Sequence, residues 1–328
     1  MSHRHRRRAR IRCLEFVSSV RPRRCKGYLV TTTRTRLRPG VTLLEVLVAV
    51  AIVAVVAALT VCAVQKARMA SAKSFCANNL RQVGFSLHLF TEAKGAFPPG
   101  VVAPAADAKH PFMGWQLHLM PYIEQQAVWD EAVEAYRRNS NFLADPPHPG
   151  ASRVIKTLIC NSDSRVIVPQ TVPGGAAKGF TSYLGVSGSH SKRGDGMLFC
   201  GSAVRPLDVQ DGASNTLFVG ERPPSADLVF GWWYAGWGQD QDGDGDMVLG
   251  VRATNVTAGS AYCPPGPYRY GVGRFEEQCS MFHFWSPHVG GANFLLVDGS
   301  VRLIGYSADD LMPALATRAG GEAVAVPE

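Results

Sequence analysis

The longest apolar stretch of the chain lies near its N-terminus, where residues 46–64 contain no charged side chain. Together with residues 41–45 it comprises 24 residues, of which Glu45 is the only charged one. At about 1.5 Å per residue, such a segment forms a helix of roughly 36 Å, which is long enough to cross a bilayer. The pattern therefore predicts a transmembrane helix over residues 41–64.

This helix is expected to continue beyond the membrane over residues 65–92, which are rich in strong helix formers. Apolar side chains recur there at intervals of three or four positions, at Leu80, Val83, Leu87 and Phe90. That spacing gives an amphipathic stripe able to pack on a sheet. Gly95 and the prolines of residues 98–99 should end the helix, because proline breaks a helix and disfavours a helical residue before it.

The remaining residues, 93–328, are predicted to form an α+β head in which the long N-terminal helix packs on an antiparallel, β-rich sheet with extra loops. A second helix is expected over residues 115–137, broken or bent at Pro121. Beyond it the chain is rich in Gly, Pro and Asn, and short β-prone runs occur at residues 181–186, 216–219, 227–234, 293–297 and 301–304. This is the composition of a sheet with many turns.

The last two of these runs are joined by residues 298–300, Asp-Gly-Ser, which is a strong hairpin signal because Asp-Gly accepts positive φ angles. After the hairpin, Ser307 is predicted to be the N-cap of a short helix with Asp310 at its third position. Pro313 is expected to kink that helix.

The charge of the chain is divided unevenly. Residues 1–40 hold 13 of the 34 Lys and Arg residues and one of the 26 acidic residues, so this leader carries +12 and the remainder −4. Because the basicity belongs to the leader, it does not favour nucleic-acid binding by the head. A basic flank predicts an N-terminus in the cytoplasm and a head outside the membrane. Val30 is an alternative translation start.

Residues 40–45, Gly-Val-Thr-Leu-Leu-Glu, connect the basic leader to the apolar helix. They resemble the processing site of type IV prepilins and pseudopilins, in which the first mature residue is usually phenylalanine rather than Val41. The resemblance implies cleavage after Gly40 by a prepilin peptidase, N-methylation of Val41 and a role for Glu45 in assembly with other pilin-like subunits. A carboxylate in lipid needs a partner, and the α-ammonium of Val41 in a neighbouring subunit suits it. The alternative is an uncleaved signal anchor.

A second resemblance covers about residues 41–321. The segments that carry it are residues 76–84, 97–100, 115–125, 160–163 and 211–216. They are similar to a large bacterial family of unknown function that usually follows a prepilin-type leader and is also catalogued under a solute-binding label. His288, nine further residues and Asp298-Gly299 are similar to the His-x9-Asp-Gly signature that closes this family. The resemblance brings no established activity with it.

The head contains five cysteines, at positions 76, 160, 200, 263 and 279, whereas Cys13 and Cys25 belong to the leader and Cys62 to the membrane helix. No Cys-x-x-Cys pair occurs, so the spacing argues against a thiolate metal site. An exported head permits disulfides, but five cysteines leave one over and the sequence does not define the pairing.

The carboxylates of Asp240, Asp242, Asp244 and Asp246 alternate along a glycine-rich loop, and such oxygen ligands suit Ca²⁺. The loop is not an EF-hand, because the twelfth position is Val251 rather than the bidentate Glu that an EF-hand requires. Major pseudopilins of secretion systems use a calcium loop, and the resemblance to them favours a looser site. The alternative is a solvated acidic turn.

Nothing in the sequence predicts an enzyme. Residues 185–189 do not fit a nucleophile elbow, and His288 and Asp298 are better explained as a loop buttress and a hairpin turn. His190, His283 and His288 would form a metal site only if the fold gathered them. The aromatic residues of the 232–237 segment are expected to be core rather than a sugar-stacking surface.

Two classes of function remain. The first is a non-enzymatic, pilin-like subunit anchored by a single helix in the bacterial inner membrane, with no cofactor apart from the candidate Ca²⁺. It would assemble into a filament or a structure related to type II secretion. The second is a tethered extracytoplasmic module that binds a solute, a glycan or a protein. A concave pocket beside residues 232–237 would favour the second class.

Overall fold

The computed structural model describes residues 40–105, 107–172, 175–256, 263–322 and 324–327. The predicted leader, residues 1–40, lies outside them apart from Gly40. The contacts divide the chain into two compact units, residues 1–57 and 58–328. Each is described by itself.

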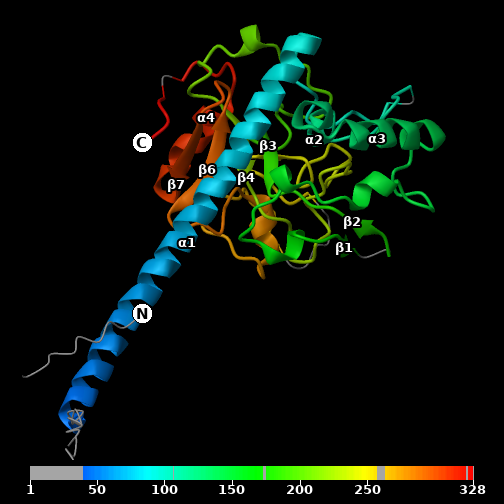
Figure 1. Cartoon of the computed structure of the whole chain (residues 1–328). Helices are drawn as coiled ribbons and strands as arrows, with labels where there is room; N and C mark the ends of the chain where they lie inside the picture. Colours follow the sequence, from blue (N-terminus) through cyan, green and yellow to red (C-terminus); the bar gives the residue numbers. More distant parts are fainter. Residues whose placement is uncertain (1–39, 106, 173–174, 257–262, 323, 328) are drawn as a thin grey trace, which may run out of the picture. The chain divides into compact units, whose positions relative to one another are not determined.

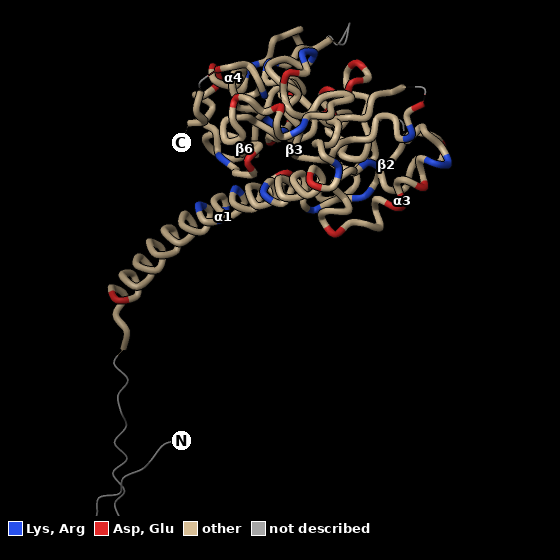
Figure 2. The backbone as a smooth tube through the Cα atoms, turned by 90° about the horizontal axis from the view of Figure 1, so that it is seen from above, with Lys and Arg blue, Asp and Glu red and all other residues tan. Residues whose placement is uncertain are grey.

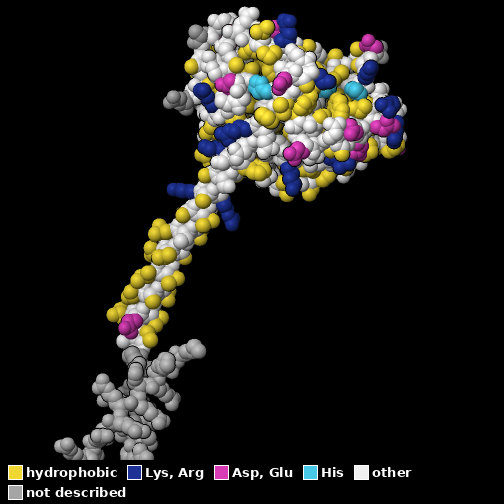
Figure 3. Space-filling model, turned by 45° about the horizontal axis from the view of Figure 1, so that its top comes forward, with side chains coloured by type: hydrophobic (Ala, Val, Ile, Leu, Met, Phe, Trp, Pro, Cys, Tyr) yellow, Lys and Arg dark blue, Asp and Glu magenta, His cyan; other side chains and the backbone are white. Residues whose placement is uncertain are grey.

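The first described element is α1 (Leu43–Lys94), a continuous helix of 52 residues. Every residue from 40 to 71 is exposed. Among the described residues, α1 is the one helix long and apolar enough to cross a membrane. Its uncharged stretch is an unbroken tan tube in Figure 2, and Figure 3 shows hydrophobic side chains along the visible face of this stretch. The predicted helices over residues 41–64 and 65–92 are thus one element.

The end of α1 follows from its sequence. Gly95 has a φ of 81° and its N–H donates to the Thr91 carbonyl at 2.7 Å, which is a conformation that glycine adopts without strain. The C-terminal part of α1 crosses one face of the sheet (Figure 1). Gly84 allows a close approach there, because an added Cβ would lie 2.7 Å from Leu295 Cδ1.

The head is built on a five-stranded sheet with the order β5-β3-β4-β6-β7. The strands are β3 (Tyr183–Gly188), β4 (Leu217–Glu221), β5 (Val248–Gly250), β6 (Gly291–Leu296) and β7 (Val301–Gly305). Three of the four pairings are antiparallel, as predicted, whereas β5 pairs with β3 in parallel. The sheet is therefore mixed. A separate two-stranded sheet joins β1 (Gln170–Thr171) to β2 (Ala177–Lys178).

The helical elements on the head are short. The expected helix over residues 115–137 is divided into α2 (Trp115–His118), the 3-10 helix η1 (Met120–Ile123) and α3 (Gln126–Arg138). Pro121 lies in the first turn of η1. Further 3-10 helices are η2 (Pro149–Ser152), η3 (Lys156–Leu158), η4 (Ser164–Val166), η5 (Pro206–Asp208) and η6 (Gln278–Phe282).

The two faces of the sheet bury two apolar cores. One core joins α1, α2 and α3 to side chains such as Val219 and Leu295. The other joins Leu217, Phe294 and Leu296 to α4 (Met312–Ala316). Alternate residues of β6 face opposite cores, as expected for a strand covered on both faces.

The β6–β7 hairpin is confirmed, with one refinement of its turn. Gly299 has a φ of 85°, but Asp298 does not have a positive φ. The Leu296 N–H donates to the Ser300 carbonyl at 2.9 Å, so three residues form the loop. Asp298 Oδ1 accepts from the Ser300 N–H at 2.8 Å and shapes this turn.

Two local predictions are wrong. Residues 227–234 do not form a strand, because Asp227 Oδ1 accepts from the Val229 N–H and Leu228 adopts a φ of 59°, which turns the chain. Ser307 is not an N-cap: it lies inside the 3-10 helix η7 (Tyr306–Leu311), whose N-cap is Gly305. Pro313 lies in the first turn of α4, where the missing N–H costs nothing.

Candidate functional site

The N-terminal segment places the predicted processing and assembly residues at the start of α1. Val41 is 73% exposed, and Gly40 precedes it in irregular backbone. The Thr42 N–H and hydroxyl both donate to Glu45 Oε2, at 2.8 and 2.9 Å, and the Glu45 N–H donates to Thr42 Oγ1 at 3.3 Å. This reciprocal pattern is a capping box that begins α1.

A second group of chemistry-bearing residues lies inside the head. Cys76, Cys160, Glu221 and His288 each offer one ligand atom, and these four atoms lie within 4.8 Å of one another. All four residues are buried, with exposed fractions of 0, 1, 2 and 8%. Within the residues that the structure describes, no other group of three or more His, Cys, Asp or Glu residues meets this criterion. We refer to these four residues as the Cys-Glu-His cluster.

Four distant parts of the chain supply the cluster. Cys76 projects from α1, Cys160 follows η3, Glu221 ends β4 and His288 precedes β6. Tyr183 pairs with Glu221 across β3 and β4. Glu221 therefore lies on the same face of the sheet as Tyr183, which is the face that α1 covers. The Tyr183 hydroxyl donates to the Cys76 carbonyl at 3.4 Å.

Hydrogen bonds hold the Glu221 side chain and the loop that carries His288. Asn293 donates to Glu221 from its N–H at 2.6 Å and from Nδ2 at 3.1 Å to both carboxylate oxygens. Ser286 Oγ accepts from the His288 N–H at 3.1 Å and donates to the Gly291 carbonyl at 2.7 Å. The cluster is therefore held by partners on its own loops and strands.

The loop that carries Cys160 is tied to α1 and to the sheet. Asn79 of α1 donates from Nδ2 to the Ile159 carbonyl at 2.9 Å, and the Cys160 N–H donates to Ser182 Oγ at 2.9 Å. Both contacts are buried. They fix the position of the Cys160 sulfur independently of the other cluster residues.

The histidine faces both a sulfur and a carboxylate. His288 Nε2 lies 3.4 Å from Glu221 Oε1 and 3.6 Å from Cys160 Sγ. Burial disfavours its protonation, but hydrogen bonds with Cys160 and Glu221 outweigh burial and raise the pKa of His288 to about 9. A hydrogen bond from Cys76 lowers the pKa of Cys160 to about 6, and the same bond together with burial raises the pKa of Cys76. The hydrogen bond between the two cysteines therefore favours the negative charge on Cys160 rather than on Cys76.

Sequence spacing did not predict this cluster and disfavoured thiolate ligands, because its four residues are far apart in the chain. The usable signal was that Cys76, Cys160 and His288 each lie in a segment that carries the second family resemblance. Glu221 had no such signal.

His190 and His283 do not belong to the cluster. His288 precedes β6, whereas Asp298 and Gly299 follow it in the hairpin turn, so this signature spans a strand rather than forming one site.

The acidic loop has a different arrangement. Lys192 Nζ lies 2.9 Å from Asp240 Oδ2 and 2.6 Å from Asp242 Oδ2. Asp244 and Asp246 are buried instead. Asp244 Oδ2 accepts from Gln239 Nε2 at 2.7 Å. The two outer carboxylates therefore share an ammonium, whereas the two inner ones turn into the head.

Backbone N–H groups bind the innermost carboxylate. Asp246 accepts from Gly231 at 3.0 Å and from Gly238 at 2.8 Å. Burial raises the pKa of Asp246 to about 6, and burial together with the charge of Asp242 raises that of Asp244 to about 7. The calcium site at the acidic loop stays a prediction.

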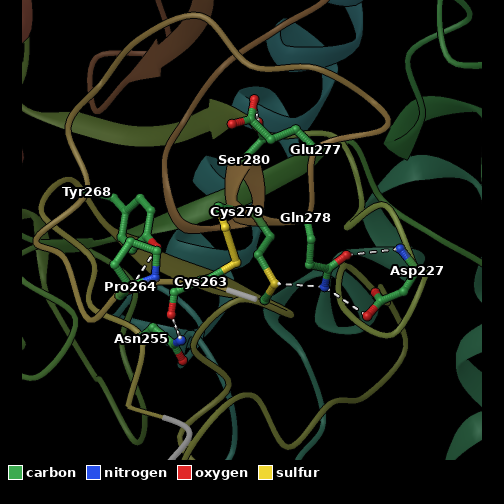
Figure 4. The surroundings of a disulfide bond; sticks show 10 residues. Asp227, Asn255, Cys263, Pro264, Tyr268, Glu277, Gln278, Cys279 and Ser280 are labelled. Atoms are coloured by element: carbon green, nitrogen blue, oxygen red, sulfur yellow. Dashed lines mark hydrogen bonds between the residues drawn. A yellow bond between two sulfur atoms is a disulfide. The ribbon is translucent and has the colours of Figure 1, made fainter. Parts of the chain in front are cut away.

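The cysteines outside the cluster have separate roles. Cys263 and Cys279 form a disulfide (Figure 4). Around it, Asn255 Nδ2 donates to the Cys263 carbonyl at 2.8 Å, and Gln278 Nε2 donates to Asp227 Oδ2 at 2.8 Å. Cys62 and Cys200 are free thiols. The pairing that the sequence left open is thus one disulfide with Cys76, Cys160 and Cys200 reduced.

The aromatic segment is mainly core, as predicted. Trp233 and Tyr234 are buried, Trp232 is partly buried, and Trp237 is 44% exposed. Lys178 Nζ lies 5.0 Å from the centre of the Trp232 ring and 5.5 Å from that of Phe142. Such contacts stabilise a buried ammonium.

The α+β head, together with the one long apolar helix among the described residues, is typical of membrane-anchored, pilin-like proteins. A family model described as "Prokaryotic N-terminal methylation motif" matches residues 36–61, and one described as "Protein of unknown function (DUF1559)" matches residues 65–311. The second match covers most of the chain, so the protein belongs to that family. The first supports a pilin-like protein that prepilin peptidase processes. No curated protein and no solved structure matches the chain.

Proposed function

We propose that this protein is a pilin-like subunit that assembles through its N-terminal helix into a filament or secretion-related structure. The observation that carries the proposal is the methylation-motif match over residues 36–61, which includes Gly40, Val41 and Glu45. In that segment an exposed, apolar helix begins with a single carboxylate. Cleavage after Gly40 would create an ammonium four residues before that carboxylate.

The orientation in this proposal has the N-terminus in the cytoplasm and the head outside the inner membrane. The +12 charge of residues 1–40 supports it, because positive flanks remain cytoplasmic. The disulfide between Cys263 and Cys279 also supports it, because disulfides persist in oxidising compartments. Lys66 and Arg68, the first basic residues after the apolar stretch, would lie at the outer interface.

The function is non-enzymatic in this proposal. Both family models describe either the leader or a head without an assigned reaction. The Cys160 sulfur, the most nucleophilic group of the cluster, belongs to a residue that is only 1% exposed. A nucleophile enclosed in this way does not meet a substrate in the described conformation.

The test is to isolate the chain from membranes and to combine N-terminal peptide mass analysis with crosslinking in intact cells. We expect a mature chain that begins with methylated Val41 and a ladder of crosslinked oligomers. A mature chain that retains residues 1–40 would overturn the pilin-like proposal. A processed chain without any ladder would favour the alternative, a lone tethered binding module.

A further inference from the structure

The ligand set of the Cys-Glu-His cluster matches the coordination chemistry of zinc. Zinc binds thiolate sulfur, imidazole nitrogen and carboxylate oxygen, usually in a tetrahedron with bonds of about 2.0–2.3 Å. In such a tetrahedron, neighbouring ligand atoms lie about 3.3–3.8 Å apart. The distances from His288 Nε2 to Glu221 Oε1, 3.4 Å, and to Cys160 Sγ, 3.6 Å, fall in this range.

Charge balance also favours a divalent cation. Two cysteines and a glutamate within 4.8 Å of one another can contribute three negative charges when deprotonated, and His288 is neutral when its ring nitrogen is a metal ligand. Burying unbalanced carboxylates and thiolates is costly, and buried charges are normally paired or bound to a metal.

The surroundings hold the ligands as a metal site requires. Asn293 donates to both Glu221 oxygens, and the bonds of Asn79 and Ser182 fix the Cys160 loop. Such outer partners orient metal ligands and are part of a site's design.

An entry path lies next to the histidine. A cavity of about 300 Å³ is lined by His288, Ser162, Val289 and residues of α1 that include Met69 and Lys73. His288 is the cluster residue among its lining, and residues of α1 form one side of the cavity. An ion could therefore enter beside His288, and the four protein ligands would then leave no position for a substrate.

We propose that the head binds one zinc ion through Cys76, Cys160, Glu221 and His288, as a structural site that fastens α1 to the sheet. The ion links α1 to β4 and to the loops before β6 and after η3. It also protects two thiols from oxidation in the compartment in which Cys263 and Cys279 are paired. This inference concerns the head and does not depend on filament assembly.

The first experiment uses the full chain purified from membranes in mild detergent. We expect stoichiometric zinc by elemental analysis, and two additional cysteines that become alkylated only after the metal is removed under denaturing conditions. Replacement of zinc by Co²⁺ should give the visible bands of a tetrahedral site and a thiolate-to-metal charge-transfer band. Because these measurements use the wild-type chain, they do not depend on whether a variant folds.

The variants test the ligand set. Cys160→Ser, Glu221→Gln and His288→Ala should each lose most of the zinc, whereas the matched control Cys200→Ser should retain it. Removing the metal from the wild type should lower its melting temperature, because binding free energy contributes to folding. A Cys76–Cys160 disulfide without metal would overturn the proposal. Zinc retained by all three ligand variants, or another metal bound stoichiometrically instead, would also overturn it.

Discussion

Glu45 accepts two hydrogen bonds from Thr42, one from its N–H at 2.8 Å and one from its hydroxyl at 2.9 Å. The residue that the pilin resemblance assigns to assembly therefore also caps its own helix. Both bonds are made by Oε2, which leaves the carboxylate with further lone pairs for a partner. The proposed charge pairing of Glu45 and its capping contacts are separable by mutation because glutamine also completes a capping box.

Glu45→Gln should leave α1 capped but abolish pairing with the Val41 ammonium of a neighbouring subunit. Breaking a buried ion pair typically costs on the order of 3–5 kcal/mol, so crosslinked oligomers should largely disappear while processing and membrane insertion continue. Glu45→Ala should have the same effect on assembly and should also lose a cap worth about 1 kcal/mol. The measurement is in-cell crosslinking of processed chains.

The matched control is Glu92→Ala, which removes an exposed carboxylate from the same helix. It should leave the oligomer ladder unchanged. If the ladder of Glu45→Gln equals that of the wild type while Glu45→Ala loses its ladder, then Glu45 acts through capping alone and the pairing idea is wrong.

Gly40→Ala should block processing. The resemblance implies that the peptidase cuts after Gly40, and an added methyl group at this position obstructs the scissile bond. Immunoblotting should then detect the precursor in membranes, and peptide mass analysis should find no methylated Val41. Gly95→Ala, at the other end of α1, serves as a control for general damage and should still be cleaved. Efficient cleavage of Gly40→Ala would show that the peptidase cuts at a different position.

Local patterns in the sequence predicted those parts of the fold that depend on interactions between residues close together in the chain. The uncharged run, the helical spacing and Gly95 together defined α1, and Asp298-Gly299 marked the hairpin. The prediction of a strand over residues 227–234 failed because a side-chain turn at Asp227 competed with β-propensity. The parallel pairing of β5 was missed because it depends on which distant strand is available.

The Cys-Glu-His cluster could not have been assembled from sequence spacing. Its members are separated by 84, 61 and 67 positions, and only the packing of α1 on the sheet brings them together. The sequence did place Cys76, Cys160 and His288 in recognisable segments. The sequence did not show the register between β3 and β4. Glu221 reaches the cluster only because it ends β4 opposite Tyr183.

Asp244→Asn should stabilise the protein at alkaline pH in calcium-free buffer. Burial first, and then the charge of Asp242, raise the pKa of Asp244 from 3.8 to about 7. Because the folded state binds the proton more tightly, wild-type stability falls as pH rises from about 4 to about 7. The advantage of Asn should grow over this window by an amount on the order of 2 kcal/mol between pH 5 and pH 8.

The control for this titration is in the same loop. Hydrogen bonding to Lys192 and its charge lower the pKa of Asp240, so its contribution is present above pH 3.8 and is lost as pH falls. Asp240→Asn should therefore be slightly destabilising at pH 8. Thermal unfolding of the full chain in detergent measures both variants. A pH-independent difference between Asp244→Asn and the wild type would show that burial does not hold the proton there.

Calcium binding by the acidic loop should raise the melting temperature of the full chain. A cation would have to displace Lys192 from Asp240 and Asp242, so we expect a weak site with a Kd on the order of 10⁻⁴–10⁻³ M, as in extracellular modules. At about ten times Kd, binding contributes about 1.4 kcal/mol, which is a shift of a few degrees for a head of this size. Ca²⁺ is titrated without a chelator, because a chelator would also remove the proposed zinc ion.

Asp242→Ala should remove the calcium shift, and Lys192→Ala should strengthen it by freeing both carboxylates. Asp107→Ala, an exposed aspartate outside the loop, should leave the shift unchanged. Mg²⁺ should have a smaller effect, because it dehydrates reluctantly and demands near-octahedral geometry. If Ca²⁺ leaves the melting curves of the wild type and of Lys192→Ala unchanged, the loop is an acidic turn whose outer carboxylates serve only to bind Lys192.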